Sequence, residues 1–168
     1  MSATIRRATP GDADRLRAIA EAAKSSWGYD AAKVGAWAAS MDVTGVGRIP
    51  KEIYVAEDDG LQAGWMSVAP GDIDGVWLLD DLWVDPRSMR RGIGSKLLRH
   101  AVELVRERGG TWLEWEAEPN ALGFYERHGA RYVPRQRAER VGADPAGARG
   151  GRARGERRRC ALTSAEPR

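Results

Sequence analysis

The sequence predicts a single domain of the mixed α+β class, and three observations support this prediction. The chain has 168 residues, which is the size of one ordinary domain with a buried core. Strand patterns and helix patterns follow one another along residues 3–133. A strand, a glycine loop and an amphipathic helix succeed each other over residues 76–105, and a second strand–helix unit follows at 112–128.

The N-terminal part predicts one strand and two helices. Residues 3–8 have the pattern of a short strand. Thr9 can cap the helix that follows, and Pro10 suits its first position. Residues 25–29 form a loop that contains Trp27 and Tyr29, and residues 31–40 are a second helix candidate.

The central part predicts a hairpin and a long strand. Residues 53–56 and 63–68 are strand candidates, and Asp59-Gly60 between them is a strong hairpin turn. Residues 76–84 form a long apolar strand that contains Asp80 and Asp81, and Pro86 ends it.

A strong helix opens at the glycine loop and closes at Gly109-Gly110. Its apolar residues share one face: Ile93, Leu97, Leu98, Ala101, Val102, Leu104 and Val105. Residues 112–117 predict another strand, residues 121–128 a short helix, and residues 130–133 the start of a last strand.

Composition divides the chain at residue 133. The whole chain has a formal charge of +3. Residues 134–168 hold ten arginines against four acidic residues, so this segment is +6 and residues 1–133 are −3. The segment is rich in Arg, Ala, Gly and Pro and poor in large apolar residues, which predicts a disordered tail after a folded domain of residues 1–133.

Several classes of protein are disfavoured by composition. Cys160 is the only cysteine, and His100 and His128 are the only histidines, so we expect no disulfide framework and no metal centre. No apolar run approaches the about 18 residues of a membrane-spanning helix, and residues 1–9 lack a targeting stretch. We expect a soluble, cytoplasmic protein.

The loop at residues 90–96 has the character of an anion site. The first N–H groups of a helix have no partner within the helix, and glycines let a phosphate approach the backbone. Arg90, Arg91 and Lys96 add positive charge. The alternative is that the glycines only make a tight turn. The order of Ser95 and Lys96 does not fit a Walker loop, and Leu97 does not fit a dinucleotide fingerprint.

These residues resemble two motifs of the GNAT superfamily of N-acetyltransferases. Residues 82–86, 91–94 and 97–98 are similar to the family's acetyl-CoA-binding motif. Residues 118–121 and 124–130 are similar to its later strand–helix motif. The resemblance covers about residues 3–133. It implies an α/β/α fold with a mixed, mostly antiparallel sheet and one splayed pair of strands.

The resemblance implies acetyl-CoA as co-substrate. The backbone of Leu82, Trp83 and Val84 would hold the pantetheine arm, and an N–H at Val84 would polarise the thioester carbonyl. Asn120 matches a residue that often touches this arm, although a helix cap is the alternative. The backbone of residues 89–95 would hold the pyrophosphate: Met89, Arg90, Arg91, Gly92, Ile93, Gly94 and Ser95.

Met89 departs from the family pattern, which has Arg or Gln at this position. The sequence therefore does not indicate how tightly this chain binds acetyl-CoA. The tail is a second departure, because nothing after Pro134 alternates like the family's last strand. Either the fold ends early, or a partner supplies that strand, or the tail results from an altered reading of the coding sequence.

The resemblance also implies direct transfer of the acetyl group to an amine. Tyr125 matches the tyrosine that protonates the departing thiolate, although a core aromatic is the alternative. Asp81 is the first candidate for the general base, and an ion pair with an arginine is the alternative. Trp27 and Tyr29 are candidates for contact with the acceptor, by cation–π interaction. The acceptor would be a small-molecule or peptide amine, and a homodimer is compatible with the family.

Two other functions stay open at this point. A nucleic-acid-binding module would use the arginine-rich tail, but the folded part is acidic and carries no recognition motif, so nucleic acid is not the expected partner. A degenerate acyltransferase would bind CoA without turnover, which the departures at Met89 and in the tail suggest.

Overall fold

The computed structural model describes residues 3–47, 50–133 and 158–163. Short 3₁₀ turns at Pro10–Asp12, Pro86–Ser88 and Pro119–Ala121 each begin with proline, whose fixed φ suits a first helical position. The helices and strands, in chain order, are β1 (Thr4–Arg7), α1 (Ala13–Ser25), α2 (Ala31–Ala39), β2 (Glu52–Asp58), β3 (Leu61–Pro70), β4 (Val76–Val84), α3 (Ile93–Glu107), β5 (Trp112–Ala117), α4 (Leu122–Arg127), β6 (Arg131–Tyr132) and β7 (Arg158–Thr163).

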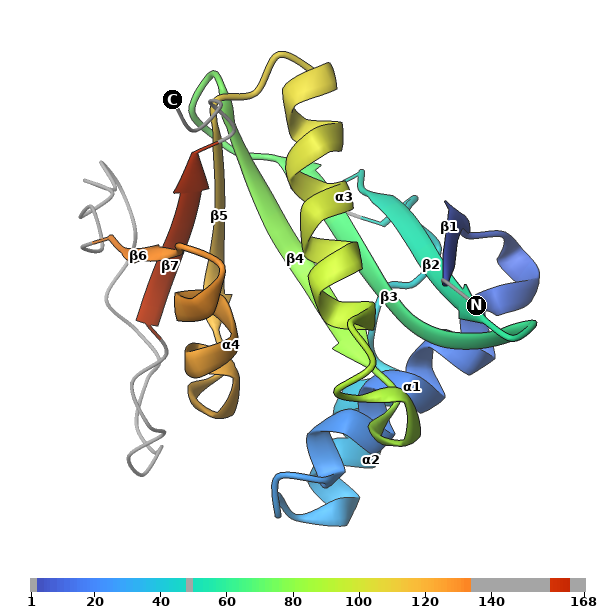
Figure 1. Cartoon of the computed structure of the whole chain (residues 1–168). Coiled ribbons are helices and arrows are strands. Elements are labelled where there is room, and N and C mark those ends of the chain that lie inside the picture. The colour runs from blue at the N-terminus through green and yellow to red at the C-terminus, as the bar shows by residue number, and fades with distance from the viewer. Residues whose placement is uncertain (1–2, 48–49, 134–157, 164–168) are drawn as a thin grey trace, which may run out of the picture.

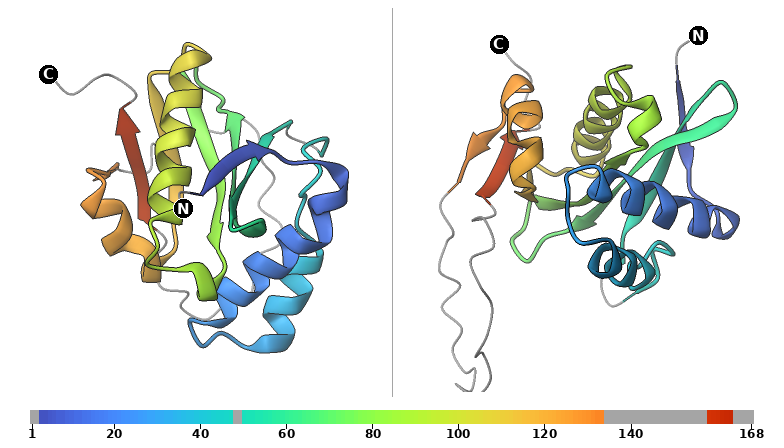
Figure 2. Two further views of the ribbon diagram at one scale, coloured as in Figure 1. Left: turned by 45° about the vertical axis from the view of Figure 1, so that its right-hand side comes forward. Right: turned by 90° about the horizontal axis from the view of Figure 1, so that it is seen from below.

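One seven-stranded sheet forms the middle layer, with the strand order β1-β2-β3-β4-β5-β7-β6. Every pair of neighbours is antiparallel except β4 and β5, which are parallel. Helices α1 and α2 cover one face, and α3 and α4 cover the other (Figure 2). The predicted α+β class and the mostly antiparallel sheet are confirmed.

The pairing of β4 with β5 is short. Only Val76–Leu78 of β4 pair with Trp112–Glu114 of β5. Beyond these residues the two strands diverge, as Figure 1 shows. Strand β5 instead pairs along its whole length with β7, from Trp112 to Ala117. The sheet therefore opens between the second half of β4 and the second half of β5.

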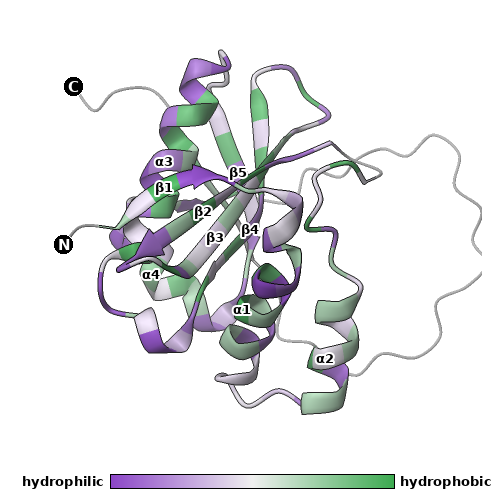
Figure 3. Ribbon diagram, turned by 90° about the vertical axis from the view of Figure 1, so that its right-hand side faces the viewer, coloured by the Kyte–Doolittle hydropathy of each residue, from purple (hydrophilic) through white to green (hydrophobic). Residues whose placement is uncertain are grey.

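Each face of the sheet has its own hydrophobic core, and Figure 3 shows hydrophobic residues along the central strands. On one face, Leu97, Leu98 and Ala101 of α3 are buried against Met66 and Val68 of β3. The apolar stripe read from the sequence of this helix is thus the side that packs on the sheet. Each fully buried leucine contributes about 1.5–3 kcal/mol to stability.

The opposite core lies under α1. Leu16 and Ile19 pack with Val55 and Trp65, and the indole N–H of Trp65 donates a hydrogen bond to the carbonyl of Leu16 at 2.9 Å.

Within the described residues, no helix has both the length and the apolar character that crossing a bilayer requires.

The prediction that residues after 134 form no strand is wrong for Arg158–Thr163, which form β7. Cys160 and Ala161 are buried there, paired in register with Trp115 and Glu114 of β5. Small side chains suffice at these positions because the strand is stabilised by pairing on both sides, with β5 and with β6. The remainder of the predicted disordered tail, residues 134–157 and 164–168, lies outside the described residues.

Candidate active site

A cavity of about 520 Å³ lies between the end of β4, the N-terminus of α3, and α4. Most of the residues predicted to hold acetyl-CoA line it. They are Leu82, Trp83, Val84, Met89, Arg90, Gly92, Ile93, Gly94, Ser95 and Asn120. We call this space the cofactor cavity.

The N-terminus of α3 points N–H groups into this cavity. The first helical hydrogen bond runs from the N–H of Lys96 to the carbonyl of Gly92, at 3.0 Å. The N–H groups of residues 93–95 consequently have no partner within the helix. Arg90 and Gly92 adopt left-handed φ values of 62° and 80°, which shape the loop before the helix. This arrangement suits a pyrophosphate group.

Gly94 sets the width of the cofactor cavity. A Cβ atom at this position would lie 3.3 Å from the ring of Phe124 and 3.6 Å from the side chain of Val84. The space between α3 and α4 therefore has little room for a side chain at residue 94. The geometry fits a ligand that must approach the loop backbone closely.

Two of the three predicted phosphate cations are engaged elsewhere. The guanidinium of Arg91 pairs with Asp58 at 2.7 Å and lines a neighbouring cavity, which shares Gly92, Ile93 and Ser95 with the cofactor cavity. The ammonium of Lys96 donates to the carbonyl of Ala3, the residue before β1, and lines the same neighbouring cavity. Arg90 alone of these cations lines the cofactor cavity, together with Met89.

Tyr125 is buried and lines the cofactor cavity. Its ring packs against Trp115 of β5 and Phe124, with centroids 4.7 and 5.1 Å away. Burial raises the pKa of its hydroxyl above the ordinary value, with a smaller contribution from Cys160. The phenol is therefore a proton donor, rather than a phenolate, at neutral pH.

His128 joins the two walls of the cofactor cavity. Its Nε2 lies 2.9 Å from the hydroxyl of Ser95 on α3, and its Nδ1 lies 2.8 Å from the carbonyl of Phe124. The sequence did not indicate this contact, because the two residues are 33 positions apart.

A second cavity, of about 390 Å³, lies on the side of α1 and α2. Trp83 lines both this cavity and the cofactor cavity, so the two adjoin at the opening between β4 and β5. We call it the acceptor cavity. The carboxylates Asp42, Asp80, Asp81, Glu116 and Glu118 line it beside Lys24 and Lys51.

An aromatic cage forms part of the acceptor side. The ammonium of Lys24 lies 4.9, 4.7 and 5.9 Å from the ring centroids of Tyr29, Trp37 and Trp83. It also lies 3.5 Å from Glu118. Of the predicted acceptor residues, Tyr29 belongs to this cage, whereas Trp27 lines the cofactor cavity. Tyr29 thus makes a cation–π contact, but its cation is the chain's own Lys24.

Asp81 lies in the wall of the acceptor cavity and is 7% exposed. Its Oδ2 accepts from Ser67 at 2.6 Å and from Lys51 at 2.9 Å, and its Oδ1 accepts from the indole of Trp83 at 3.3 Å. Asp80, which is exposed, contacts the same ammonium at 2.8 Å. The ion pair expected as the alternative role of Asp81 is therefore present, but its cation is Lys51 and not an arginine.

Burial raises the pKa of the Asp81 carboxyl, although Lys51 and Ser67 oppose this effect. Burial alone would lower the pKa of the Lys51 ammonium, but attraction to Asp81 and hydrogen bonds to both aspartates outweigh it and raise the pKa. Lys51 is therefore held firmly as a cation beside a carboxyl of raised pKa.

Comparisons with known proteins agree with this geometry. The acetyltransferase (GNAT) domain family matches residues 50–129. The uncharacterized N-acetyltransferase YafP of Escherichia coli K12 is 32% identical over 143 residues, which cover 83% of this chain and 88% of that protein.

Solved structures share the fold. The PaiA N-acetyltransferase of Thermoplasma acidophilum, in complex with coenzyme A, has a TM-score of 0.74 at 15% identity and covers 97% of this chain and 99% of its own. A GNAT family acetyltransferase of Brucella melitensis, in complex with acetyl-CoA, has a TM-score of 0.61 at 28% identity, covering 77% and 82%. The chain therefore belongs to the GNAT superfamily of acetyl-CoA-dependent N-acetyltransferases.

Proposed function

We propose that this protein transfers an acetyl group directly from acetyl-CoA to a primary amine, with both substrates bound at once. The observation that carries the proposal is the pair of adjoining cavities, with Trp83 in the wall of each. One cavity offers backbone N–H groups to a phosphate-bearing ligand, and the other offers carboxylates and aromatic rings to an amine.

The chain's own groups divide the work on the cofactor side. The backbone of residues 82–84 holds the pantetheine arm, and the N–H of Val84 polarises the thioester carbonyl. The N–H groups at the start of α3 hold the pyrophosphate, and Asn120 contacts the arm. Tyr125, whose pKa is raised by burial, gives its proton to the departing thiolate.

Asp81 removes the proton from the amine. Its raised pKa makes the Asp81 carboxylate a stronger base than an ordinary aspartate. Glu118 is the second candidate, because its side chain already contacts an ammonium group, that of Lys24, at 3.5 Å. Comparison of the pH–rate profiles of Asp81→Asn and Glu118→Gln distinguishes them, since only the variant that lacks the base loses the acid limb.

The acceptor is a positively charged small-molecule or peptide amine. Five carboxylates line the acceptor cavity against two lysines, so a cation is favoured there. The aromatic rings beside this cavity already surround one alkylammonium group, that of Lys24, which supports an acceptor of the same chemical kind.

Calorimetry of acetyl-CoA with the full chain, followed by a thiol-release assay over a panel of amines, tests the proposal. We expect saturable binding of acetyl-CoA and release of CoA with cationic amines. Absence of acetyl-CoA binding would refute the proposal. Binding without release on any amine would show instead a CoA-binding protein that has lost catalysis.

A further inference from the structure

Lys24 lies where an acceptor amine should lie. Its side chain is only 13% exposed, and its ammonium group is surrounded by three aromatic rings and the carboxylate of Glu118. These are the groups that recognise an alkylammonium. The chain thus places one of its own primary amines in the acceptor cavity.

Lys24 also lies at the junction with the cofactor cavity. Ala23, the residue before Lys24, and Trp27, three residues after it, both line the cofactor cavity. Glu118, its ion-pair partner, accepts a hydrogen bond at 3.1 Å from Asn120, another residue of that cavity. Trp83, one wall of the cage, is shared by both cavities. Transfer to Lys24 requires a change in its rotamers that turns the flexible side chain toward the opening between β4 and β5.

We propose that the enzyme acetylates its own Lys24 within one molecule; this rests on the proposed acetyltransferase function. Nζ loses a proton to Glu118, 3.5 Å away, and from there to solvent. Nζ then forms a bond to the carbonyl carbon of the thioester of acetyl-CoA, and the carbon–sulfur bond breaks. The nitrogen then loses its second proton to solvent as the amide forms, and the sulfur takes the hydroxyl proton of Tyr125, which solvent restores. The products are an amide on Lys24 and CoA.

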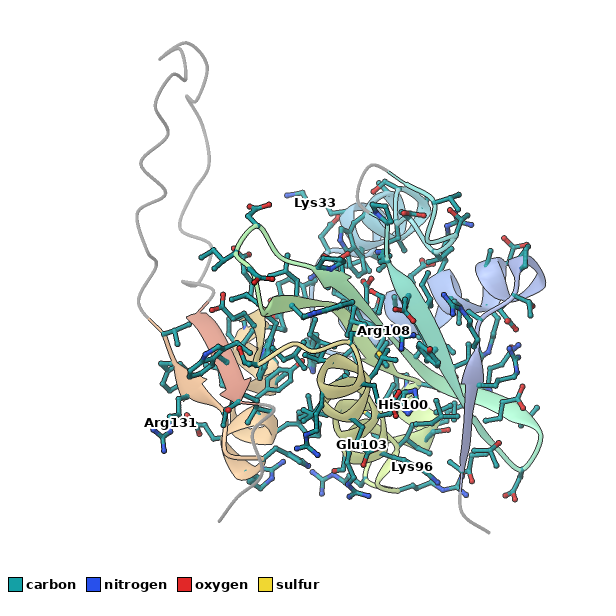
Figure 4. The ribbon with its side chains drawn as sticks, turned by 90° about the horizontal axis from the view of Figure 1, so that it is seen from above. Lys33, Lys96, His100, Glu103, Arg108 and Arg131 are labelled. Atoms are coloured by element: carbon teal, nitrogen blue, oxygen red, sulfur yellow. The ribbon has the colours of Figure 1, made fainter. Side chains whose placement is uncertain are left out.

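The other three lysines of the chain have different surroundings. The ammonium of Lys51 contacts Asp80 and Asp81 at 2.8 and 2.9 Å, and these contacts keep it protonated. Lys96 donates to the carbonyl of Ala3. Lys33 is exposed on α2, and Figure 4 shows it and Lys96 on opposite sides of the molecule. Lys33 is therefore a measure of spontaneous, uncatalysed acetylation.

Peptide mapping of the full chain after incubation with acetyl-CoA tests the inference. Trypsin cleaves after unmodified Lys24 but not after the acetylated residue, so modification produces a peptide of residues 18–33. We expect this peptide to appear with a first-order rate that does not depend on enzyme concentration. Tyr125→Phe should slow its appearance about 100-fold, and Lys24→Arg should remove the modification while keeping the positive charge.

The outcomes separate the two proposals. If the chain binds acetyl-CoA and acetylates added amines, but Lys24 is modified no faster than Lys33, self-acetylation is refuted and the proposed function stands. A rate proportional to enzyme concentration would also refute transfer within one molecule. If acetyl-CoA does not bind at all, the proposed function itself fails. Lys33→Arg, at an exposed position, is the matched control and should leave the modification of Lys24 unchanged.

Discussion

The imidazole of His128 and the hydroxyl of Ser95 lie 2.9 Å apart and link α4 to the first turn of α3 across the cofactor cavity. The other ring nitrogen, Nδ1, faces the carbonyl of Phe124, which can only accept a hydrogen bond. Nδ1 therefore carries a proton, and Nε2 shares a hydrogen bond with the hydroxyl of Ser95. The contact holds the two walls of the cavity at a fixed separation.

Replacing Ser95 by alanine removes this link without adding volume. We expect the Kd for acetyl-CoA to rise about fivefold and the free energy of unfolding to fall by about 1 kcal/mol, because one hydrogen bond is lost. Calorimetry and denaturant unfolding measure the two effects. Thr111→Ala, which removes a long 3.3 Å contact to the carbonyl of Gly75, is the control and should leave the Kd unchanged. An unchanged Kd in Ser95→Ala would contradict the role of the link.

Tyr125→Phe removes the proposed acid and keeps the ring that packs on Trp115. We expect kcat to fall about 100-fold with little change in KM, because the hydroxyl acts on the leaving thiolate and not on binding. Since the pKa of Tyr125 is raised, its ionisation should not limit the wild-type rate up to the ordinary tyrosine pKa of about 10. Tyr132→Phe is the matched control, and equal rates in the two variants would refute the assignment.

Lys51→Met leaves the Asp81 carboxylate buried without its cation. We expect the pKa of Asp81 to rise further, so the acid limb of kcat/KM moves to higher pH by about one unit or more, because the base must be deprotonated to act. The free energy of unfolding should fall by about 3 kcal/mol. The pH–rate profile measures the first effect and thermal unfolding the second.

Lys33→Met, at an exposed position, is the control for the loss of a lysine. If Lys51→Met folds poorly, Asp81→Asn still tests whether Asp81 is the general base. If Asp81 is the base, Asp81→Asn removes the acid limb. An acid limb that survives in Asp81→Asn shows that another group, with Glu118 the first candidate, accepts the proton.

Gly94→Ala places a methyl group 3.3 Å from the ring of Phe124, inside the cofactor cavity. We expect the KM for acetyl-CoA to rise about tenfold, because the ligand can no longer approach the loop backbone closely. Gly123→Ala is the control, since its Cβ would meet only a side-chain atom of Arg127, at 3.6 Å. This control should have the wild-type KM for acetyl-CoA, and its free energy of unfolding should rise by about 0.5–1 kcal/mol because alanine has a higher helix propensity than glycine. An equal KM in the two variants would place the ligand elsewhere.

Local patterns predicted the elements that form the cofactor cavity. The bounds of β4 and β5 agree with the sequence prediction, and α3 begins at the glycine loop, because each carries an apolar pattern that its own burial requires. Most residues predicted to hold the cofactor belong to one contiguous strand–loop–helix unit, and nearly all of them line the same cavity.

The acceptor cavity could not be predicted in the same way. Lys24 lies at the end of α1, Lys51 directly before β2 and Glu118 directly after β5, and no local pattern joins these three residues. Strand β7 was missed for a related reason. Its buried residues Cys160 and Ala161 are small, and what makes them a strand is pairing with β5, more than 40 residues earlier in the chain.

The thiol of Cys160 reports whether β7 is paired. It is 2% exposed, and β5 and β6 flank it on either side. We expect a thiol reagent to label the native protein at least about 1,000-fold more slowly than the chain unfolded in guanidinium chloride, because labelling requires β7 to detach. Acetyl-CoA should slow labelling further, since Tyr125 of the cofactor cavity belongs to the same buried cluster. Labelling of the native protein within about tenfold of the unfolded rate would show that β7 is not a stable strand of the sheet.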